Sequence, residues 1–209
     1  MRIGELSQRT GVPVATLKHY LREGLLPRGR ATARTQAEYG EEHVHRLRLV
    51  QALTEVGGLT LAATRTVLDA VTTPGTSVTQ ALGVATEALP PRPAEDADLD
   101  LAPAQRALEL AGWDTWPDSA PVRQLATAMR ALEAAGLDAS PELVAERARL
   151  LAPLVREEVA AVPDTSIADA ATFAALGTVL YEPLLLALRR LGHQDASVRR
   201  FGHPGQRPT

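Results

Sequence analysis

The stretch MRIGELSQRTGVPVATLKHYLREGLLP, residues 1–27, decides how the N-terminal part of the chain folds. Gly11 stands where a reversal of the chain requires a positive φ, and the fixed φ of Pro13 suits the start of a following helix. Apolar residues recur at helical spacing on both sides of this turn: Ile3, Leu6 and Val12, then Val14, Leu17 and Leu21. The spacing predicts two short helices within residues 2–24 that meet at a tight turn and share one buried stripe.

The next segment, residues 25–40, has a different pattern. Pro27 ends the second helix, and Arg28-Gly29-Arg30 predicts a charged turn. The residues from Thr32 to Tyr39 tolerate an extended backbone, so we predict a short two-stranded wing. A helix, a tight turn, a second helix and a wing form a winged helix-turn-helix, whose second helix enters the major groove of DNA.

The remaining chain is predicted to be helical apart from one linker. Helices are expected over residues 41–56, 60–71 and 76–89, with Thr60 as the N-cap of the second. Four prolines and four acidic residues make 90–103 a linker. Beyond it, an Ala- and Leu-rich sequence predicts helices over 104–111, 119–135, 140–161 and 166–191. The predicted fold class is therefore mainly α, a winged helix-turn-helix followed by an all-α C-terminal domain.

These elements predict four segments. Residues 1–75 form the DNA-binding domain, and 76–103 hold a short helix and the linker. Residues 104–195 form an all-α domain for dimerisation and effector binding, and 196–209 form a mobile tail. The helix expected at 166–191 is apolar on nearly every side and contains Pro183, which should kink it. Because such a helix must be buried on every side, we predict that it reaches a dimer interface; a central core helix is the alternative.

Charge is distributed unevenly along the chain. The 209 residues carry 22 basic and 25 acidic side chains, a net charge of −3. Residues 1–71 hold ten basic and seven acidic side chains, whereas 72–209 hold 12 and 18. The net charge of +3 therefore coincides with the predicted winged helix, which favours a nucleic-acid partner for that part of the chain.

Several classes of protein are disfavoured. The chain has no cysteine, which excludes disulfides, thiolate chemistry and iron–sulfur clusters. His43 and His45 would point about 200° apart on a helix, so we expect surface histidines rather than metal ligands. No phosphate-binding loop or nucleophile–base spacing is evident, so we expect no enzyme activity, no cofactor and no metal. The lack of a signal core and of a long apolar run predicts a cytoplasmic protein without a membrane partner.

Residues 1–71 resemble the MerR family of bacterial transcription regulators. The motifs that carry the resemblance are IGEL at 3–6, TGV at 10–12, HY at 19–20, GLLP at 24–27, YGEEHV at 39–44 and GGLTL at 57–61. The resemblance implies a homodimer that binds double-stranded DNA at a palindromic operator or promoter. It also implies RNA polymerase as a further partner.

The resemblance further implies which residues contact DNA. The recognition helix falls on residues 13–23, where Lys18 stands in place of the usual arginine and His19 takes an aromatic position. Tyr20 is expected to contact a phosphate through its hydroxyl, and arginines of the wing are expected to contact others. The predicted DNA-binding residues are Val14, Thr16, Lys18, His19, Tyr20, Arg28, Arg30, Arg34 and Tyr39.

The chain also departs from the family pattern. Residues 35–37 read Thr-Gln-Ala where the wing of many members reads Gly-Tyr-Arg. The lack of cysteine argues against metal or oxidant sensing. Residues 72–75 interrupt the position at which many members begin a long helix that pairs antiparallel with its dimer mate. The dimer geometry, and activation by untwisting a promoter spacer, therefore stay open.

The C-terminal domain contains both tryptophans of the chain. Trp113 and Trp116, together with Met129, Phe173 and Tyr181, predict a pocket for a small apolar effector; an ordinary aromatic core is the alternative. Two further alternatives concern the function as a whole. One is an effector-free architectural DNA-binding protein, and the other is a simple steric repressor.

Overall fold

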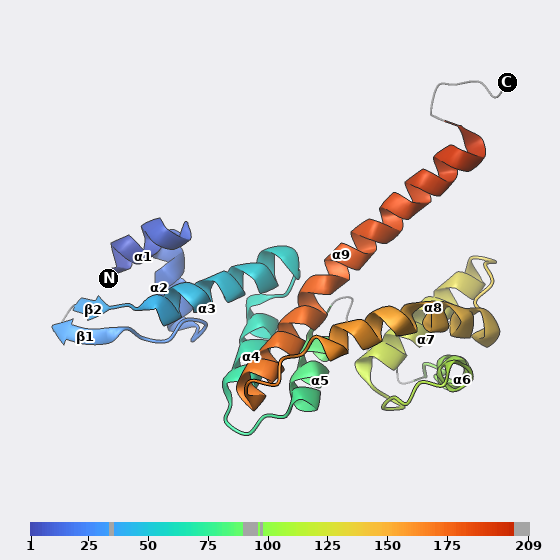
Figure 1. The fold of residues 1–209 in the computed structure, drawn as a ribbon, viewed down its shortest axis with the longest axis horizontal. Helices are drawn as coiled ribbons and strands as arrows, with labels where there is room; N and C mark the ends of the chain where they lie inside the picture. Colours follow the sequence, from blue (N-terminus) through green and yellow to red (C-terminus); the bar gives the residue numbers. More distant parts are fainter. Residues whose placement is uncertain (34–35, 90–95, 97, 203–209) are drawn as a thin grey trace. The chain divides into compact units, whose positions relative to one another are not determined.

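Figure 1 shows the computed structural model, which describes residues 1–33, 36–89, 96 and 98–202. Within these residues the chain is helical apart from one two-stranded sheet, which confirms the predicted fold class. The first seven elements are α1 (Ile3–Thr10), α2 (Val14–Arg22), β1 (Arg30–Ala33), β2 (Gln36–Glu38), α3 (Glu41–Gln51), η1 (Ala52–Val56) and α4 (Leu61–Thr72). The others are α5 (Val78–Ala88), α6 (Ala102–Ala111), α7 (Ala120–Ala134), α8 (Pro141–Ala160) and α9 (Ile167–Phe201).

The turn between α1 and α2 is closed by local hydrogen bonds. Gly11 has a φ of 72° and donates its N–H to the Ser7 carbonyl at 2.9 Å. The Ser7 hydroxyl donates to the Val12 carbonyl at 2.6 Å, and Pro13 immediately precedes α2. The predicted pair of short helices around a tight turn is therefore confirmed.

One apolar core holds α1, α2, α3 and the wing together. Its buried members are Leu6, Val12, Leu17, Leu26, Tyr39, Val44 and Leu47. Full burial of a large apolar side chain contributes roughly 1.5–3 kcal/mol, so this core fixes the orientation of α2. The Arg9–Glu41 ion pair joins α1 to α3 at the surface.

The predicted wing is present as the antiparallel pair β1–β2. Arg30 lies opposite Glu38 and Ala31 opposite Ala37, with an irregularity before Ala33. Met1 extends the pairing, because its carbonyl accepts the Tyr39 N–H and its ammonium donates to the Tyr39 carbonyl, both at 2.9 Å. The end of the wing is thereby tied to the first residue of the chain.

The helix predicted over 41–56 changes type after Gln51. The chain continues without a break from α3 into η1, a π-helical segment in which Gly57 donates its N–H to the Ala52 carbonyl at 3.0 Å. The next helix, α4, begins after Thr60, whose hydroxyl accepts the Ala63 N–H at 3.2 Å. The N-cap predicted at Thr60 is confirmed.

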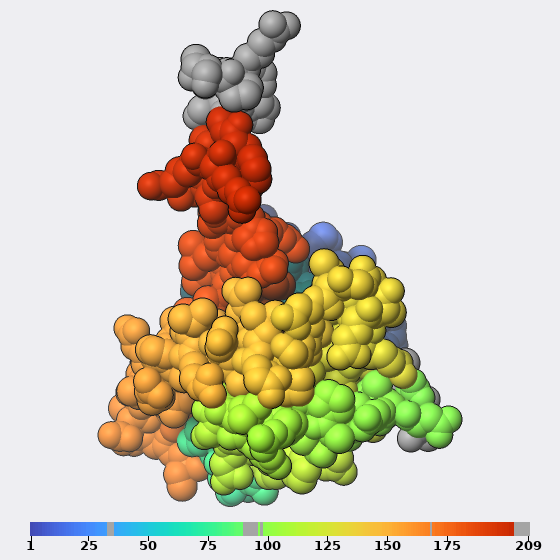
Figure 2. Space-filling view, turned by 90° about the vertical axis from the view of Figure 1, so that its right-hand side faces the viewer, coloured from blue at the N-terminus to red at the C-terminus, as the bar shows by residue number. Residues whose placement is uncertain are grey.

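Helices α6, α7 and α8 enclose a separate apolar core, and α8 lies along α6 (Figure 2). The buried members of this core are Leu99, Ala104, Leu108, Val122, Ala126, Met129 and Ala139. Small alanines on α6 and α8 permit the close approach of the two helices. The start of α8 at Pro141, after Ser140, agrees with the sequence pattern.

Half of the predicted linker over 90–103 lies outside the described residues, but its last part packs against the helices that follow it. Leu99 is buried in the core just described. The Asp96 carboxylate accepts from Arg130 at 2.8 Å, and the Asp96 carbonyl accepts from Arg123 at 2.7 Å. Helix α6 begins at Ala102, two residues earlier than predicted, because a proline is tolerated in the first turn of a helix.

Helix α9 extends ten residues beyond its predicted end at Leu191 and includes part of the predicted mobile tail. Pro183 and Gly192 both lie inside the helix. A single glycine costs a helix only about 1 kcal/mol, and an Asp195–Arg199 ion pair at 2.9 Å supports the next turn. The helix ends before Gly202, whose φ is 80°. The remainder of the predicted tail, from residue 203, lies outside the described residues.

The chain forms two compact units. One consists of Met1–Gly57 together with the described residues from Thr178 onward, and the other consists of Gly58–Gly177. The predicted boundaries near residues 75 and 103 differ from this division, because α4 packs against α5 and α9 takes part in both units. By length and composition alone, α9 is long and apolar enough to cross a membrane.

Candidate nucleic-acid interface

Helix α2 presents one buried and one exposed side. Leu17 is fully buried, Thr16 and Val14 are half-buried, and Lys18 is exposed. Within the described part of the chain, Lys18 makes no hydrogen bond or ion pair. The burial of Leu17 therefore leaves the Lys18 ammonium available to an anionic partner.

His19 and Tyr20 follow on the same helix and are half-buried. Arg22 lies 2.9 Å from the Nδ1 atom of His19, and the two aromatic rings have centroids 6.2 Å apart. Burial, and to a lesser extent the carboxylate of Glu55, raise the pKa of Tyr20. The Tyr20 hydroxyl therefore stays protonated at neutral pH and can donate a hydrogen bond, as a phosphate contact requires.

The wing contributes exposed arginines at its base. Arg28 is exposed, and Arg30 forms an ion pair with Glu38 across the two strands at 2.7 Å. Arg30 lowers the pKa of Glu38, so this pair is charged on both sides near neutral pH. A phosphate would have to compete with Glu38 for Arg30, which makes Arg28 the stronger candidate. Arg34 lies outside the described residues.

Tyr39 and His43 are both buried. The Tyr39 side chain is 8% exposed and belongs to the N-terminal core, which makes it a weaker candidate for the predicted DNA contact than Lys18 or Arg28. His43 is 5% exposed rather than on the surface, and its Nδ1 accepts the Gly40 N–H at 3.0 Å. The Tyr39 and His43 rings meet edge to face at 5.1 Å. The sequence pattern does not indicate this burial, because it arises where the first turn of α3 packs against the end of the wing.

Arg22 was not among the predicted contacts, although it shares the exposed side of α2 with Lys18. The two residues are four positions apart, so they lie on the same face of the helix. The Arg22 side chain is 70% exposed, and its Nε lies 3.6 Å from the neighbouring Glu23 carboxylate. The helical spacing of basic residues would have identified Arg22 from the sequence.

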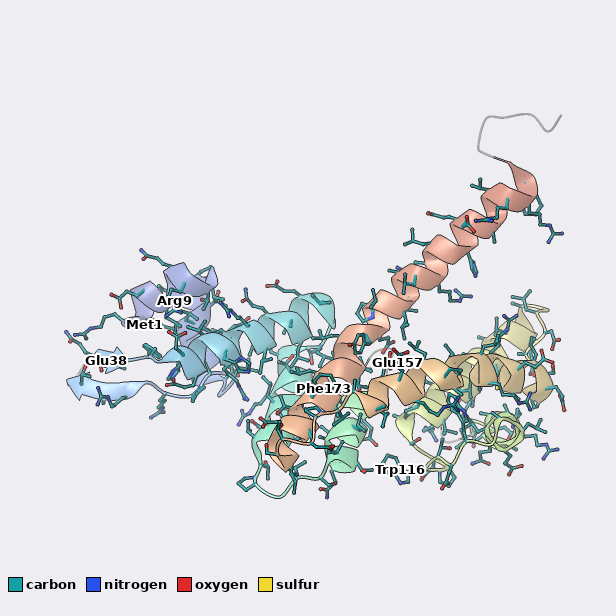
Figure 3. All side chains as sticks on the ribbon, in the orientation of Figure 1. Met1, Arg9, Glu38, Trp116, Glu157 and Phe173 are labelled. Carbon is teal, nitrogen blue, oxygen red and sulfur yellow. The ribbon has the colours of Figure 1, made fainter. Side chains whose placement is uncertain are left out.

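Two of the five predicted effector residues line one pocket. Trp113 and Trp116 line a pocket of about 560 Å³, whereas Met129 is buried in the adjacent core. Phe173 and Tyr181 are on α9 and are not among the lining residues. Figure 3 labels Trp116 and Phe173, which project from separate elements. The full lining is Thr79, Leu108, Trp113, Asp114, Thr115, Trp116, Ser119, Pro121, Val122 and Leu125.

The described residues contain no group of three or more His, Asp and Glu side chains arranged to hold a metal ion. The basic face of α2 and the pocket beside Trp116 are candidate sites that the described geometry offers.

Comparison with known proteins identifies the N-terminal third of the chain. Residues 1–71 match the model of the MerR HTH family of regulatory proteins. The nodulation protein NolA of Bradyrhizobium elkanii is 45% identical over 56 residues, and NolA of Bradyrhizobium sp. strain NC92 is 43% identical over 56 residues. These alignments cover 27% of the chain and only 26% and 24% of the two NolA proteins.

A solved structure extends the similarity to the rest of the chain. The crystal structure of SCO5550 from Streptomyces coelicolor A3(2), assigned as a transcriptional regulator, is 37% identical with a TM-score of 0.70. The alignment covers 99% of this chain and 100% of that one. The winged helix-turn-helix, the family match and this full-length similarity together show that the chain belongs to the MerR family of helix-turn-helix transcription regulators.

Proposed function

We propose that this MerR-type regulator binds a palindromic operator in the cytoplasm as a homodimer and responds to a small effector. The observation that carries the proposal is the exposed basic side of α2, whose Lys18 has no partner within the described residues. Since one winged helix covers only a few base pairs, two copies are needed to read a site of useful length.

The C-terminal part of α9 supports the homodimer. Tyr181, Leu184, Leu188, Leu191 and Val198 recur at spacings of three, four and seven residues, which places them along one stripe. Leu184, Leu188 and Leu191 are at least half exposed. These three leucines expose more contiguous apolar surface than a helix that faces only water normally does. A second copy of α9 would cover them.

The charges of α9 favour an antiparallel pair. Residues 178–188 contain one acidic and no basic side chain, whereas 189–202 contain four arginines and one aspartate. A parallel pair would place the two arginine-rich segments side by side. An antiparallel pair places each against the Glu182 segment of the other copy. The register that pairs Leu188 with Leu191 of the second copy also pairs Tyr181 with Val198.

The absence of native cysteine makes disulfide cross-linking a clean test of this geometry. In the antiparallel pair, a disulfide forms only when the Tyr181→Cys and Val198→Cys variants are mixed. Position 181 of one copy then lies about 25 Å from position 181 of the other, and the same holds for position 198, so neither variant can cross-link with itself. In a parallel pair each variant cross-links with itself. Self-cross-linking of either variant would overturn the antiparallel geometry, and a monomer in sedimentation would overturn the dimer.

DNA contact is tested with a duplex selected by the wild-type protein from a random-sequence pool. We expect Lys18→Ala and Tyr20→Phe to weaken binding by about tenfold, since each removes one contact worth roughly 1–3 kcal/mol. Arg28→Ala, and likewise Arg34→Ala, should lower the salt slope of binding by about 1. Arg147→Ala removes an exposed charge from α8 and serves as the matched control. Wild-type affinity and slope in all four variants would refute the proposed interface.

The pocket beside Trp116 supports a small effector, because its volume of about 560 Å³ lies in the range of ligand sites.

RNA polymerase is a partner only if the regulator activates transcription. A footprint of the dimer on its operator separates the possibilities: distortion of a long promoter spacer indicates activation, and occlusion of an undistorted promoter indicates a steric repressor. Cooperative coating of DNA beyond the operator would instead indicate the architectural protein.

A further inference from the structure

His43 is buried at the junction between the wing and α3. Its side chain is 6% exposed, and its ring meets the Tyr39 ring edge to face at a centroid distance of 5.1 Å. Tyr39 follows β2 and belongs to the N-terminal core, and Gly40 is the N-cap of α3. The His43 ring therefore lies where the chain passes from the wing into the helix behind it.

Two hydrogen bonds between Gly40 and His43 close the first turn of α3. The Gly40 N–H donates to Nδ1 of His43 at 3.0 Å, and the His43 N–H donates to the Gly40 carbonyl at 3.2 Å. In an ordinary capping box, a glutamate or glutamine supplies the side-chain acceptor at this helix position. An imidazole nitrogen differs from those acceptors, because a proton can occupy it near neutral pH and abolish the bond.

The same Nδ1 atom lies 2.9 Å from a carboxylate oxygen of Glu42. Without a proton this nitrogen can accept from Gly40, and with a proton it can donate to Glu42, but it cannot do both. The Glu42 carboxylate lies directly over Gly40, since a Cβ added to the glycine would overlap it. Protonation of His43 therefore exchanges the bond to Gly40 for a bond within α3.

The other ring nitrogen has no partner to exchange. Nε2 of His43 is buried and makes no hydrogen bond with the described part of the chain. Charged groups of the neighbouring elements are engaged elsewhere: Arg9 with Glu41, Arg30 with Glu38, and the Met1 ammonium with the Tyr39 carbonyl. Within the described residues, Glu42 is therefore the carboxylate that pairs with a protonated ring.

We infer that His43 is a positioning residue of the DNA interface and that it holds the wing only as the neutral imidazole. In that state it fixes Gly40, and through Gly40 and Tyr39 it fixes the direction in which the wing leaves the core. A proton on Nδ1 leaves the partly buried Gly40 N–H unpaired, which destabilises the junction. Acid therefore loosens the wing and weakens DNA binding. The inference rests on the proposed interface and adds the group that makes it sensitive to pH.

Two substitutions separate the acceptor from the ring. His43→Phe keeps an aromatic ring against Tyr39 but removes the acceptor, whereas His43→Gln supplies the acceptor of an ordinary capping box and cannot be protonated. At pH 8, we expect His43→Phe to bind the selected duplex about tenfold more weakly, with a salt slope lower by about 1. His43→Gln should rescue binding to within about threefold of the wild type.

The pH profile of duplex binding assigns the effect to the proton. Between pH 8 and pH 5.5, the affinity of the wild type should fall about tenfold more than that of His43→Gln. His19 is present in both proteins, so any contribution that it makes cancels. His45→Gln removes an exposed histidine two positions along the same helix and should keep the profile of the wild type.

Nuclear magnetic resonance of the wild type gives a readout that needs no substitution. At pH 8, the ring nitrogen signals of His43 should show a proton on Nε2 and none on Nδ1. The Gly40 amide signal should shift with the same midpoint as the His43 ring when the pH is lowered. A proton on Nδ1 at pH 8, or a Gly40 amide that does not follow the ring, overturns the inference.

The outcomes separate the role of His43 from the interface itself. Wild-type affinity and salt slope in His43→Phe, or the same pH profile in the wild type and His43→Gln, overturns the role of His43 and leaves the proposed interface standing. If His43→Phe fails to fold, the His43→Gln profile and the wild-type spectra still decide the question. Failure of the wild type to bind any duplex at pH 8 overturns the proposed function.

Discussion

Single residues with little room around them set the geometry of the wing. Gly29 precedes β1, and a Cβ at this position would lie 2.5 Å from the Glu38 carbonyl and 3.0 Å from the Tyr39 ring. The Glu38 carbonyl and the Tyr39 ring belong to the far end of the wing and to the N-terminal core. The absence of a side chain at Gly29 is therefore what allows the wing to close on that core.

Gly29→Ala should destabilise the protein by about 1–3 kcal/mol, because overpacking at a backbone contact forces the wing to shift. Urea unfolding measures the loss, and the same variant should bind its duplex more weakly. Gly4→Ala is the control, since nothing lies within 4 Å of a Cβ there and alanine favours the helix. Equal stability of Gly29→Ala and the wild type would contradict this account.

At the scale of elements, the continuity of α9 depends on how a lone glycine acts inside a helix. A Cβ on Gly192 would meet nothing within 4 Å, so the glycine lowers helix stability without any gain in packing. Gly202 is different, because its φ of 80° ends the helix in a conformation that other residues rarely adopt.

Gly192→Ala should therefore raise the helix content and the free energy of unfolding by about 0.5–1 kcal/mol, whereas Gly202→Ala should have no stabilising effect or lower stability. Circular dichroism during thermal unfolding distinguishes the two. If Gly192→Ala lowered stability, the continuous helix through this position would be in question, or a partner would pack closely on the glycine.

At the scale of the whole molecule, the described residues from Thr178 onward belong to the same compact unit as the N-terminal segment. Val179 of α9 is fully buried, and a Cβ added to Gly57 would overlap its Cγ1 atom. Residues 58–177, which contain the pocket beside Trp116, are therefore inserted between two segments of one compact unit. The helix that we propose as the dimer element thus belongs to the same unit as the recognition helix.

Gly57→Ala should cost about 1–3 kcal/mol by pushing Val179 away. The same substitution should cost less in a Val179→Ala background, because the smaller side chain makes room for the new methyl group. A double-mutant cycle by urea unfolding measures this coupling. Additive effects would show that the two residues do not meet as described.

Acid should weaken the fold through four carboxyl groups that are exposed or partly exposed. Hydrogen bonds from Arg30, Arg9 and Arg130 lower the pKa of Glu38, Glu41 and Asp96, and bonds from Ser140 lower that of Asp138. A lowered pKa means that the unfolded chain binds more protons, so this stability is complete above about pH 5 and is lost as the pH falls further. Melting temperatures recorded from pH 6 to pH 3 test the trend; a constant value down to pH 3 would contradict it.

The sequence alone determined the local elements and the nature of residues 1–71. Gly11, Pro13 and the apolar spacing around them specify the helix-turn-helix, because φ preferences and a 3.6-residue period act within a few residues. The same holds for the cap at Thr60 and for the basic charge of residues 1–71. The burial of Tyr39 and His43 was not foreseen, since it depends on the packing of α3 under the wing rather than on local pattern.

The tertiary structure alone decided which distant segments belong together. It placed the pocket between α5 and the Trp116 loop and added Asp114 to its lining, which includes neither Phe173 nor Tyr181. It also placed α9 from Thr178 onward in the N-terminal unit, where Gly57 contacts Val179. Those contacts depend on the shapes of side chains that are far apart in the chain. Local propensity and residue spacing do not specify which apolar surfaces will pack against each other.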